Sequence, residues 1–217
     1  MSKASEILKS CVFYGILDTG YVARKDMKLK CRALIDGGAG IIQLRAKRES
    51  TKQRAEIALE IAPLFERENA PIFIIDDDID LAKSISFAGL HIGQDDTPAA
   101  EAREILGEGR IIGLSTHSPE QASAADKMAG IIDYFAVGPV YATQTKPGRK
   151  PVGLELVSYA SKMKARLPWF AIGGVNLKTA KAVRDAGAER IVAVSDVLKP
   201  ADTANAVREL VAEFLKA

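Results

Sequence analysis

Short apolar runs alternate with longer amphipathic segments along most of the chain. The runs are rich in Ile and Val and do not alternate with polar residues, which is the pattern of strands buried on both faces of a parallel sheet. Eight such strands are predicted, at residues 12–17, 41–44, 72–75, 89–92, 111–114, 134–137, 169–172 and 190–194. Helices are predicted for the amphipathic segments between them, among them residues 51–68, 98–106, 119–129, 154–166 and 177–186.

Local signals mark the ends of several predicted helices. The pairs 97–98 (Thr-Pro) and 118–119 (Ser-Pro) each combine a capping residue with a proline suited to the first helical position. Glycines stand where helix C-caps belong, at 37–38, 130 and 187. These signals support a strict alternation of strands and helices.

Eight strand–helix units in a chain of 217 residues predict a (β/α)8 barrel, the TIM-barrel fold. We expect one domain over residues 1–217, with residues 1–11 as a lead-in helix. A doubly wound open sheet is the alternative. It usually has fewer strands and a Gly-rich fingerprint after the first one, and residues 17–20 (Leu-Asp-Thr-Gly) do not form that fingerprint.

Composition and charge narrow the class of protein. The chain has 47% hydrophobic and 27% charged residues, as ordinary globular proteins do, and its net charge of +2 includes no basic block. Binding to nucleic acid or to a membrane surface is therefore not expected. The N-terminus does not resemble a signal peptide, and no apolar run approaches the roughly 20 residues that span a bilayer. Cys11 and Cys31 lack metal-ligand spacing and are predicted to be buried thiols, so a cytoplasmic location is expected.

Two acidic clusters follow the third and fourth predicted strands. They are residues 76–78 (Asp-Asp-Asp) and residues 95–96 (Asp-Asp). Neighbouring carboxylates repel one another unless a cation lies between them. In a chain that also has cationic and Gly-rich loops, they predict a Mg²⁺ site that holds a phosphorylated substrate.

Other strand ends carry groups suited to anions. Gln43, Arg45 and Lys47 alternate at the end of the second strand, so their side chains point the same way and could bind a pyrophosphate. A solvated loop with two ordinary cations is the alternative. The long segment 138–150 contains Thr143, Thr145, Lys146 and two glycines, which together could wrap a phosphate, or could form a surface loop.

The last strands and the fifth strand complete the candidate site. Gly173 and Gly174 could let backbone N–H groups approach a phosphate, and a tight turn there is compatible with that role. At the end of the fifth strand, His117 could be an acid or base, or could cap the next helix. His91 lies inside the fourth strand and is expected to pack or hydrogen-bond locally.

Six strings along the chain resemble thiamine-phosphate synthase, in that family's order and at matching spacing. They cover nearly the whole chain and read Gln-Leu-Arg-Ala-Lys (43–47), His-Ile-Gly-Gln-Asp-Asp (91–96), Gly-Leu-Ser-Thr-His (113–117), Gly-Pro-Val-Tyr-Ala-Thr-Gln-Thr-Lys (138–146), Ala-Ile-Gly-Gly-Val (171–175) and Val-Ala-Val-Ser-Asp-Val (192–197). The resemblance implies a reaction in which hydroxymethylpyrimidine pyrophosphate loses pyrophosphate to give a pyrimidinyl-methyl cation. The nitrogen of a thiazole phosphate, either hydroxyethylthiazole phosphate or its carboxylated form, then captures that cation to give thiamine phosphate.

The resemblance also implies roles for individual residues. Binding of the pyrimidine pyrophosphate is implied for Gln43, Arg45, Lys47 and Asp76. Mg²⁺ would be held by Asp77 and Asp96 and would neutralise the departing charge. Binding of the thiazole phosphate is implied for Thr143, Thr145, Gly174, Val194 and Ser195. Catalytic roles are implied for Ser115, which would contact the pyrophosphate or the reacting pyrimidine, and for Lys146, which would stabilise the leaving group.

One stretch departs from the family pattern. Where the family has Asn-Asp-Arg after the third strand, this chain has Asp76, Asp77 and Asp78. An ionised Asp offers no hydrogen-bond donor. Asp in place of Asn at 76 and in place of Arg at 78 both make this strand end less favourable for an anion unless a cation compensates. Either a second or more tightly held Mg²⁺, or altered pyrimidine binding, is the expected consequence.

Two other functions remain open. A related thiazole tautomerase would use acid–base chemistry and a His in the loop after the sixth strand, where this chain has Pro139, and it would not need Asp77 and Asp96. A non-catalytic barrel that senses phosphorylated metabolites would not need leaving-group residues. Barrels often associate through their outer helices, so a homo-oligomer remains open as well.

Overall fold

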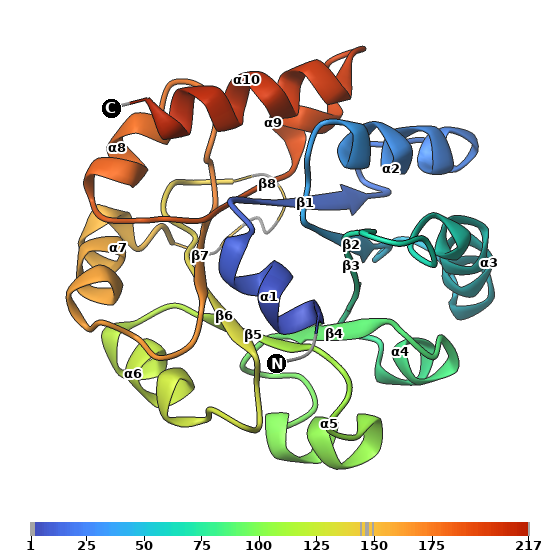
Figure 1. Ribbon diagram of the computed structural model, residues 1–217, viewed down its shortest axis with the longest axis horizontal. Helices are drawn as coiled ribbons and strands as arrows, with labels where there is room; N and C mark the ends of the chain where they lie inside the picture. Colours follow the sequence, from blue (N-terminus) through green and yellow to red (C-terminus); the bar gives the residue numbers. More distant parts are fainter. Residues whose placement is uncertain (1–2, 144, 146–147, 149, 217) are drawn as a thin grey trace.

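The protein is described by a computed structural model, which covers residues 3–143, 145, 148 and 150–216. Eight parallel strands pair in chain order and close into a barrel, with β1 against β8, as Figure 1 shows. This is the predicted (β/α)8 fold. The strands are β1 (Phe13–Asp18), β2 (Ile41–Arg45), β3 (Ile72–Asp76), β4 (Gly89–Ile92), β5 (Ile112–Thr116), β6 (Tyr134–Val137), β7 (Trp169–Ile172) and β8 (Ile191–Ala193).

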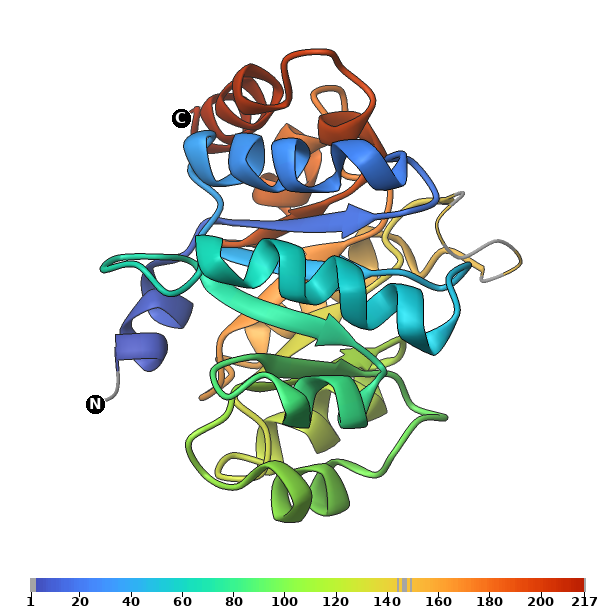
Figure 2. The same cartoon turned by 90° about the vertical axis from the view of Figure 1, so that its right-hand side faces the viewer.

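Helices form a ring around the barrel (Figure 1). They are α2 (Met27–Asp36), α3 (Thr51–Ile61), α4 (Ile79–Ser84), α5 (Ala99–Leu106), α6 (Pro119–Lys127), α7 (Gly153–Lys162), α8 (Ala180–Asp185), α9 (Ser195–Leu198) and α10 (Thr203–Leu215), with 3-10 turns η1 (Arg24–Asp26) and η2 (Ala62–Leu64). The lead-in helix α1 (Lys3–Ser10) lies across the N-terminal end of the strands, and the strand arrows in Figure 2 point to the opposite face. No helix in the described part of the chain is both long and apolar enough to span a bilayer.

Helix ends differ in places from the sequence-based prediction. Ser118 caps α6 by accepting a hydrogen bond from the backbone N–H of Gln121, and Pro119 is its first residue, as predicted. Pro98, in contrast, occupies the N-cap position of α5 rather than its first turn, and no side chain caps that helix. The helix predicted for 51–68 ends at Ile61, because Pro63 has no N–H to continue the ladder and a 3-10 turn follows.

Alternate residues of each strand separate two buried clusters. Along β1, Phe13 and Leu17 pack outward beneath the helices, whereas Tyr14 and Ile16 point into the barrel. Leu8 of α1 packs against the lower end of this interior cluster. The cavity described below opens at the opposite end, where the strands finish.

The two cysteines are both free and buried, as predicted. Burial raises the pKa of the Cys11 thiol to about 11 and that of the Cys31 thiol to about 12. Neither thiol lies in the cavity described below.

Candidate active site

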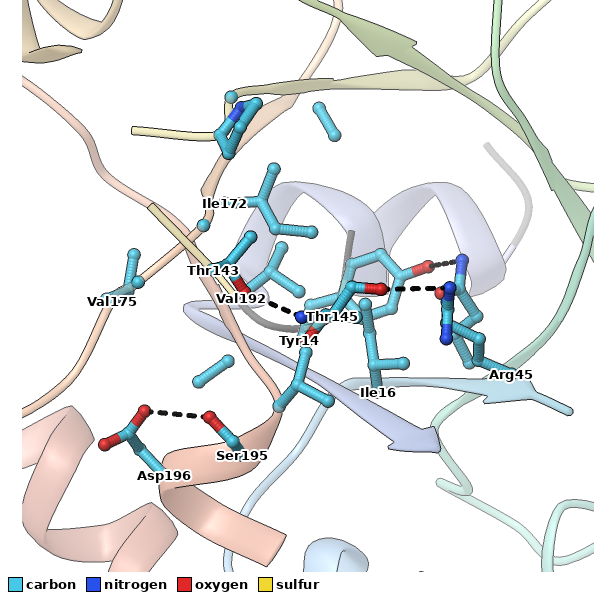
Figure 3. A pocket seen from close by; sticks show the side chains of 18 of the residues that line it. Tyr14, Ile16, Arg45, Thr143, Thr145, Ile172, Val175, Val192, Ser195 and Asp196 are labelled. Atoms are coloured by element: carbon cyan, nitrogen blue, oxygen red, sulfur yellow. Dashed lines mark hydrogen bonds between the residues drawn. The ribbon is translucent and has the colours of Figure 1, made fainter. Parts of the chain in front are cut away.

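A cavity of about 230 Å³ opens at the carboxyl ends of the strands (Figure 3). Its walls include nine of the residues that the sequence predicted for the site: Gln43, Arg45, Asp76, Ser115, Thr143, Thr145, Gly174, Val194 and Ser195. Three more, Lys47, Asp77 and Asp96, lie beside the cavity rather than in its wall. Lys146 lies outside the described residues.

Arg45 is held in place from two sides. Its Nη1 atom donates to the Asp18 carboxylate at 2.9 Å. Its Nη2 atom donates to the carbonyl of Thr145 at 3.1 Å, as Figure 3 shows. Asp18 and Arg45 are register partners on β1 and β2, so the barrel pairing itself brings them together. A guanidinium fixed in this way is preorganised to bind an anion.

Lys47 lies among carboxylates at the next strand end. Its ammonium is 3.4 Å from Asp76 and forms a hydrogen bond with Asp77. Burial works to lower the pKa of Lys47, but the hydrogen bond to Asp77 and the charge of Asp76 outweigh it, so the pKa is raised. Lys47 is therefore a stable cation beside the cavity.

Asp77 and Asp96 form the carboxylate pair predicted to hold Mg²⁺. Asp77 adopts a left-handed conformation with φ of 57°, and the Asp96 carboxylate accepts from the N–H of Gly93 at 2.7 Å. Burial and a hydrogen bond with Asp77 raise the pKa of Asp96. Mg²⁺ is commonly held by one or two carboxylates together with substrate phosphates, so this donor pair fits the ion. Among the described residues, no group of three or more His, Cys, Asp or Glu side chains could hold a metal without such a substrate.

Asp78 plays a different part from its two neighbours. It caps α4 by accepting from the N–H of Leu81 at 3.1 Å, and the Nε atom of Arg54 lies 3.4 Å from its other oxygen. The helix N-terminus and Arg54 partly offset its charge, and the expected effect of Asp78 on anion binding stays a prediction.

The loop after β6 lies against the turn after β7. The N–H groups of Val140 and Tyr141 donate to the carbonyls of Ile172 and Gly173, at 2.8 and 2.9 Å. Gly173 and Gly174 have φ values of 102° and 67°, and a Cβ atom added at Gly174 would lie 2.7 Å from the Cβ of Tyr141. The glycines are thus required by a tight turn and by a close approach of two loops, and phosphate binding there stays a prediction.

Hydroxyl groups line the two sides of the cavity. Thr145 donates its N–H to the Thr143 hydroxyl at 3.2 Å, and the Tyr21 hydroxyl lies 3.3 Å from the Thr145 hydroxyl. Ser195 is the first residue of α9, and its hydroxyl donates to Asp196 at 3.2 Å. In Figure 3 the Ser195–Asp196 pair lies away from the Arg45–Thr145 contact. Polar groups therefore line two separate parts of the cavity wall.

The two histidines have different surroundings. His91 is buried in β4 and bonds to Tyr134 and Ser115, which belong to other strands. His117 lines the cavity, and its Nδ1 atom donates to the carbonyl of Gly138. Ser118, and not His117, caps the following helix.

Comparison with known proteins decides the family. The model of the family described as thiamine monophosphate synthase matches residues 13–197. The chain belongs to this family. It is 44% identical to a thiamine-phosphate synthase of Arthrobacter sp. (strain FB24), over 81% of this chain and 83% of that protein. It is 42% identical to one from Synechococcus sp. (strain WH7803), over 83% of this chain but only 50% of that protein. The chain thus spans about half the length of several curated relatives that it matches.

Solved structures agree with this assignment. A thiamine phosphate pyrophosphorylase from Pyrococcus furiosus superposes with a TM-score of 0.82 at 30% identity, and the match covers 97% of this chain and 100% of that one. A geranylgeranylglyceryl phosphate synthase from Thermoplasma acidophilum has a TM-score of 0.72 at 14% identity, over 99% of this chain and 98% of that one, which shows the shared fold alone.

Sequence reasoning missed several polar residues of this thiamine monophosphate synthase family site. Asp18 fixes Arg45, and its place at the end of the first strand was an available signal. Tyr14 and Tyr134 lie within strands, where an aromatic residue usually indicates core, so nothing in the sequence points to their hydrogen bonds. Lys199 lines the cavity 5.5 Å above the Tyr21 ring, and no pattern in the sequence indicates it.

Proposed function

We propose that this protein is a thiamine phosphate synthase. The reaction joins hydroxymethylpyrimidine pyrophosphate to a thiazole phosphate and releases pyrophosphate. The observation that supports the proposal is that Arg45, Ser115 and Ser195 line one cavity, with the Asp77–Asp96 carboxylate pair beside it. A site for two phosphorylated substrates and a divalent cation needs this arrangement.

The pyrimidine side is built by β2 and β3. Arg45 and Lys47 would bind the pyrophosphate, and Gln43 would contact the pyrimidine portion from the cavity floor. Since Asp18 and the Thr145 carbonyl already fix Arg45, little side-chain entropy is lost when the anion binds. The carbon–oxygen bond to pyrophosphate breaks with its electron pair on oxygen, so cations placed at that oxygen favour departure.

Mg²⁺ would be held by Asp77 and Asp96. When bound, it supplies positive charge that neutralises the departing pyrophosphate. Burial and the contact with Asp77 raise the pKa of Asp96, and a cation between the two carboxylates would relieve their repulsion.

The thiazole side is built by the later strands. The hydroxyls of Thr143, Thr145 and Ser195, together with the backbone at Gly174 and Val194, would bind the thiazole phosphate. That placement directs the thiazole nitrogen toward the pyrimidine carbon, where its lone pair forms the new bond. Ser115 would contact the pyrophosphate or the reacting pyrimidine between the two sides. Lys146 would stabilise the leaving group.

The test is release of pyrophosphate by the purified protein given both substrates and Mg²⁺, with each component omitted in turn. Release that requires all three supports the synthase. Consumption of a thiazole carboxylate phosphate without pyrophosphate would indicate the tautomerase. Binding of both substrates without turnover would indicate a sensor. Asp185→Asn, on the exposed end of α8, should react like the unchanged protein.

A further inference from the structure

A buried row of hydrogen bonds crosses the interior of the barrel beneath the cavity. The Gln43 amide nitrogen lies 3.0 Å from the Tyr14 hydroxyl, and the Tyr14 and Tyr134 hydroxyls are 3.1 Å apart. The Tyr134 hydroxyl lies 3.0 Å from the Nδ1 atom of His91, whose Nε2 atom is 2.9 Å from the hydroxyl of Ser115. We call these five residues, from five different strands, the interior row.

The Gln43 amide group determines in which direction the hydrogen bonds of the interior row run, from donor to acceptor. The Gln43 amide nitrogen can only donate, so the Tyr14 oxygen accepts from it and the Tyr14 proton turns toward Tyr134. The Tyr134 proton would then go to Nδ1 of His91, which would carry no proton of its own. The His91 proton would lie on Nε2 and be donated to the oxygen of Ser115.

We propose that His91, held in its Nε2–H form by Tyr14 and Tyr134, is a positioning residue that turns the hydroxyl proton of Ser115 into the cavity. With its oxygen accepting from His91, Ser115 keeps its own proton for a ligand. At the other end of the row, the Gln43 carbonyl oxygen is left as an acceptor. The interior row therefore presents the Ser115 hydroxyl as a donor and the Gln43 carbonyl oxygen as an acceptor to the substrate. Only this contact with a substrate rests on the proposed function.

Packing around Tyr134 shows that the site is built to hold its hydroxyl. A Cβ atom added at Gly113 of β5 would lie 2.1 Å from Cζ of Tyr134 and 2.4 Å from its hydroxyl oxygen. The ring is also held edge-on by Tyr14 and Phe170, with centroids 5.9 and 5.5 Å away. A residue without a side chain at position 113 thus makes room for the phenol, and two aromatic rings fix its orientation.

The protonation of His91 can be read directly in the free protein. The chain has two histidines, so a sample labelled with ¹⁵N-histidine gives two sets of imidazole signals. The ¹⁵N shifts of a neutral ring show which of its two nitrogens carries the proton. The Nδ1 atom of His117 faces a carbonyl, which only accepts, so His117 should be the Nδ1–H form and His91 the opposite one. His117→Gln assigns the spectrum, and an Nδ1–H form for His91 would overturn the proposal.

Removing one hydroxyl tests the link to Ser115. Tyr134→Phe interrupts the row at its centre, so His91 should become a mixture of both neutral forms and kcat should fall roughly tenfold. KM for the thiazole phosphate should stay unchanged. Tyr159→Phe is the matched control, since the Tyr159 hydroxyl bonds to Ser123 on the outer helices. Thermal melts of both variants establish that each one folds.

The outcomes separate this proposal from the proposed function. If Tyr134→Phe keeps a single His91 form and wild-type kcat, the positioning role is wrong even though the synthase is active. If the unchanged protein shows the Nε2–H signal of His91 but releases no pyrophosphate, the proposed activity is wrong and the orientation of Ser115 stands.

Discussion

The ammonium nitrogen of Lys47 lies 3.4 Å from a carboxylate oxygen of Asp76, whose side chain is only 3% exposed. The same oxygen is 3.9 Å from the Nε atom of Arg45. Both cations that we propose to bind pyrophosphate therefore already face a negative charge at the end of β3. A pyrophosphate that enters the cavity has to compete with Asp76 for them.

Asp76→Asn should strengthen binding of the pyrimidine substrate. The amide keeps the size of the side chain but removes the charge beside Lys47 and Arg45, so KM for the pyrimidine pyrophosphate should fall roughly tenfold. Steady-state kinetics at saturating Mg²⁺ measures this effect, with Asp185→Asn as the control for loss of a carboxylate elsewhere. A change confined to the Mg²⁺ concentration needed for turnover would instead favour a second cation at Asp76.

The carboxylate pair should respond to Mg²⁺ together with inorganic pyrophosphate. We expect this mixture to raise the melting temperature of the protein, and Asp77→Asn or Asp96→Asn to weaken Mg²⁺ binding roughly tenfold. Melting curves over a range of Mg²⁺ concentrations measure both effects. Equal Mg²⁺ dependence in all three proteins would exclude the pair as the metal site.

The metal-free stability of this pair should depend on pH. Because the pKa of Asp96 is raised in the folded state, the folded chain binds the proton more tightly than the unfolded chain does. Its stabilising contribution is present below the unfolded pKa, ~3.9, and is lost as the pH rises through the raised value. Without Mg²⁺, Asp96→Asn should thus melt above wild type at neutral pH, and the difference should shrink as the pH falls toward 4. A constant difference would contradict this assignment.

Gly174→Ala should destabilise the fold more than Gly130→Ala does. Both glycines have positive φ, 67° and 96°, which an alanine adopts unfavourably. Each variant should therefore lose roughly 1 kcal/mol of unfolding free energy through its backbone alone. Nothing lies within 4 Å of a Cβ atom added at Gly130, whereas at Gly174 it would meet Tyr141 at 2.7 Å. Urea unfolding should show an additional loss of about 1–3 kcal/mol for Gly174→Ala. Equal losses would mean that the loop after β6 moves away without cost.

Both thiols should resist alkylation in the folded protein. With pKa values of about 11 and about 12, the thiolate fraction of Cys11 at pH 8 is roughly one in a thousand, and that of Cys31 is smaller. Iodoacetamide followed by mass spectrometry should find no modification of the folded chain and two modifications in guanidinium. Rapid labelling of either thiol before unfolding would contradict the burial of that residue.

The sequence by itself determined the barrel and the face on which its site lies. Eight buried runs separated by amphipathic segments leave few other topologies, and in a parallel barrel every strand ends at the same face. For that reason the alternation of strands and helices is enough to group Gln43, Arg45, Thr143 and Ser195 at one end of the barrel, where all four line the same cavity. The sequence also predicted the helix cap at Ser118, because its hydrogen-bond partner, the N–H of Gln121, lies only three residues away.

Only the tertiary structure decided which side chains meet. Three consecutive aspartates have three sets of contacts: Asp76 lies beside Lys47 and Arg45, Asp77 contacts Lys47 and Asp96, and Asp78 caps α4. Tyr14 and Tyr134 are 120 residues apart and share a hydrogen bond only because β1 and β6 face each other across the interior. Such contacts depend on barrel register and side-chain packing, which are set when the sheet closes, whereas periodicity along the chain reports only which face each residue occupies.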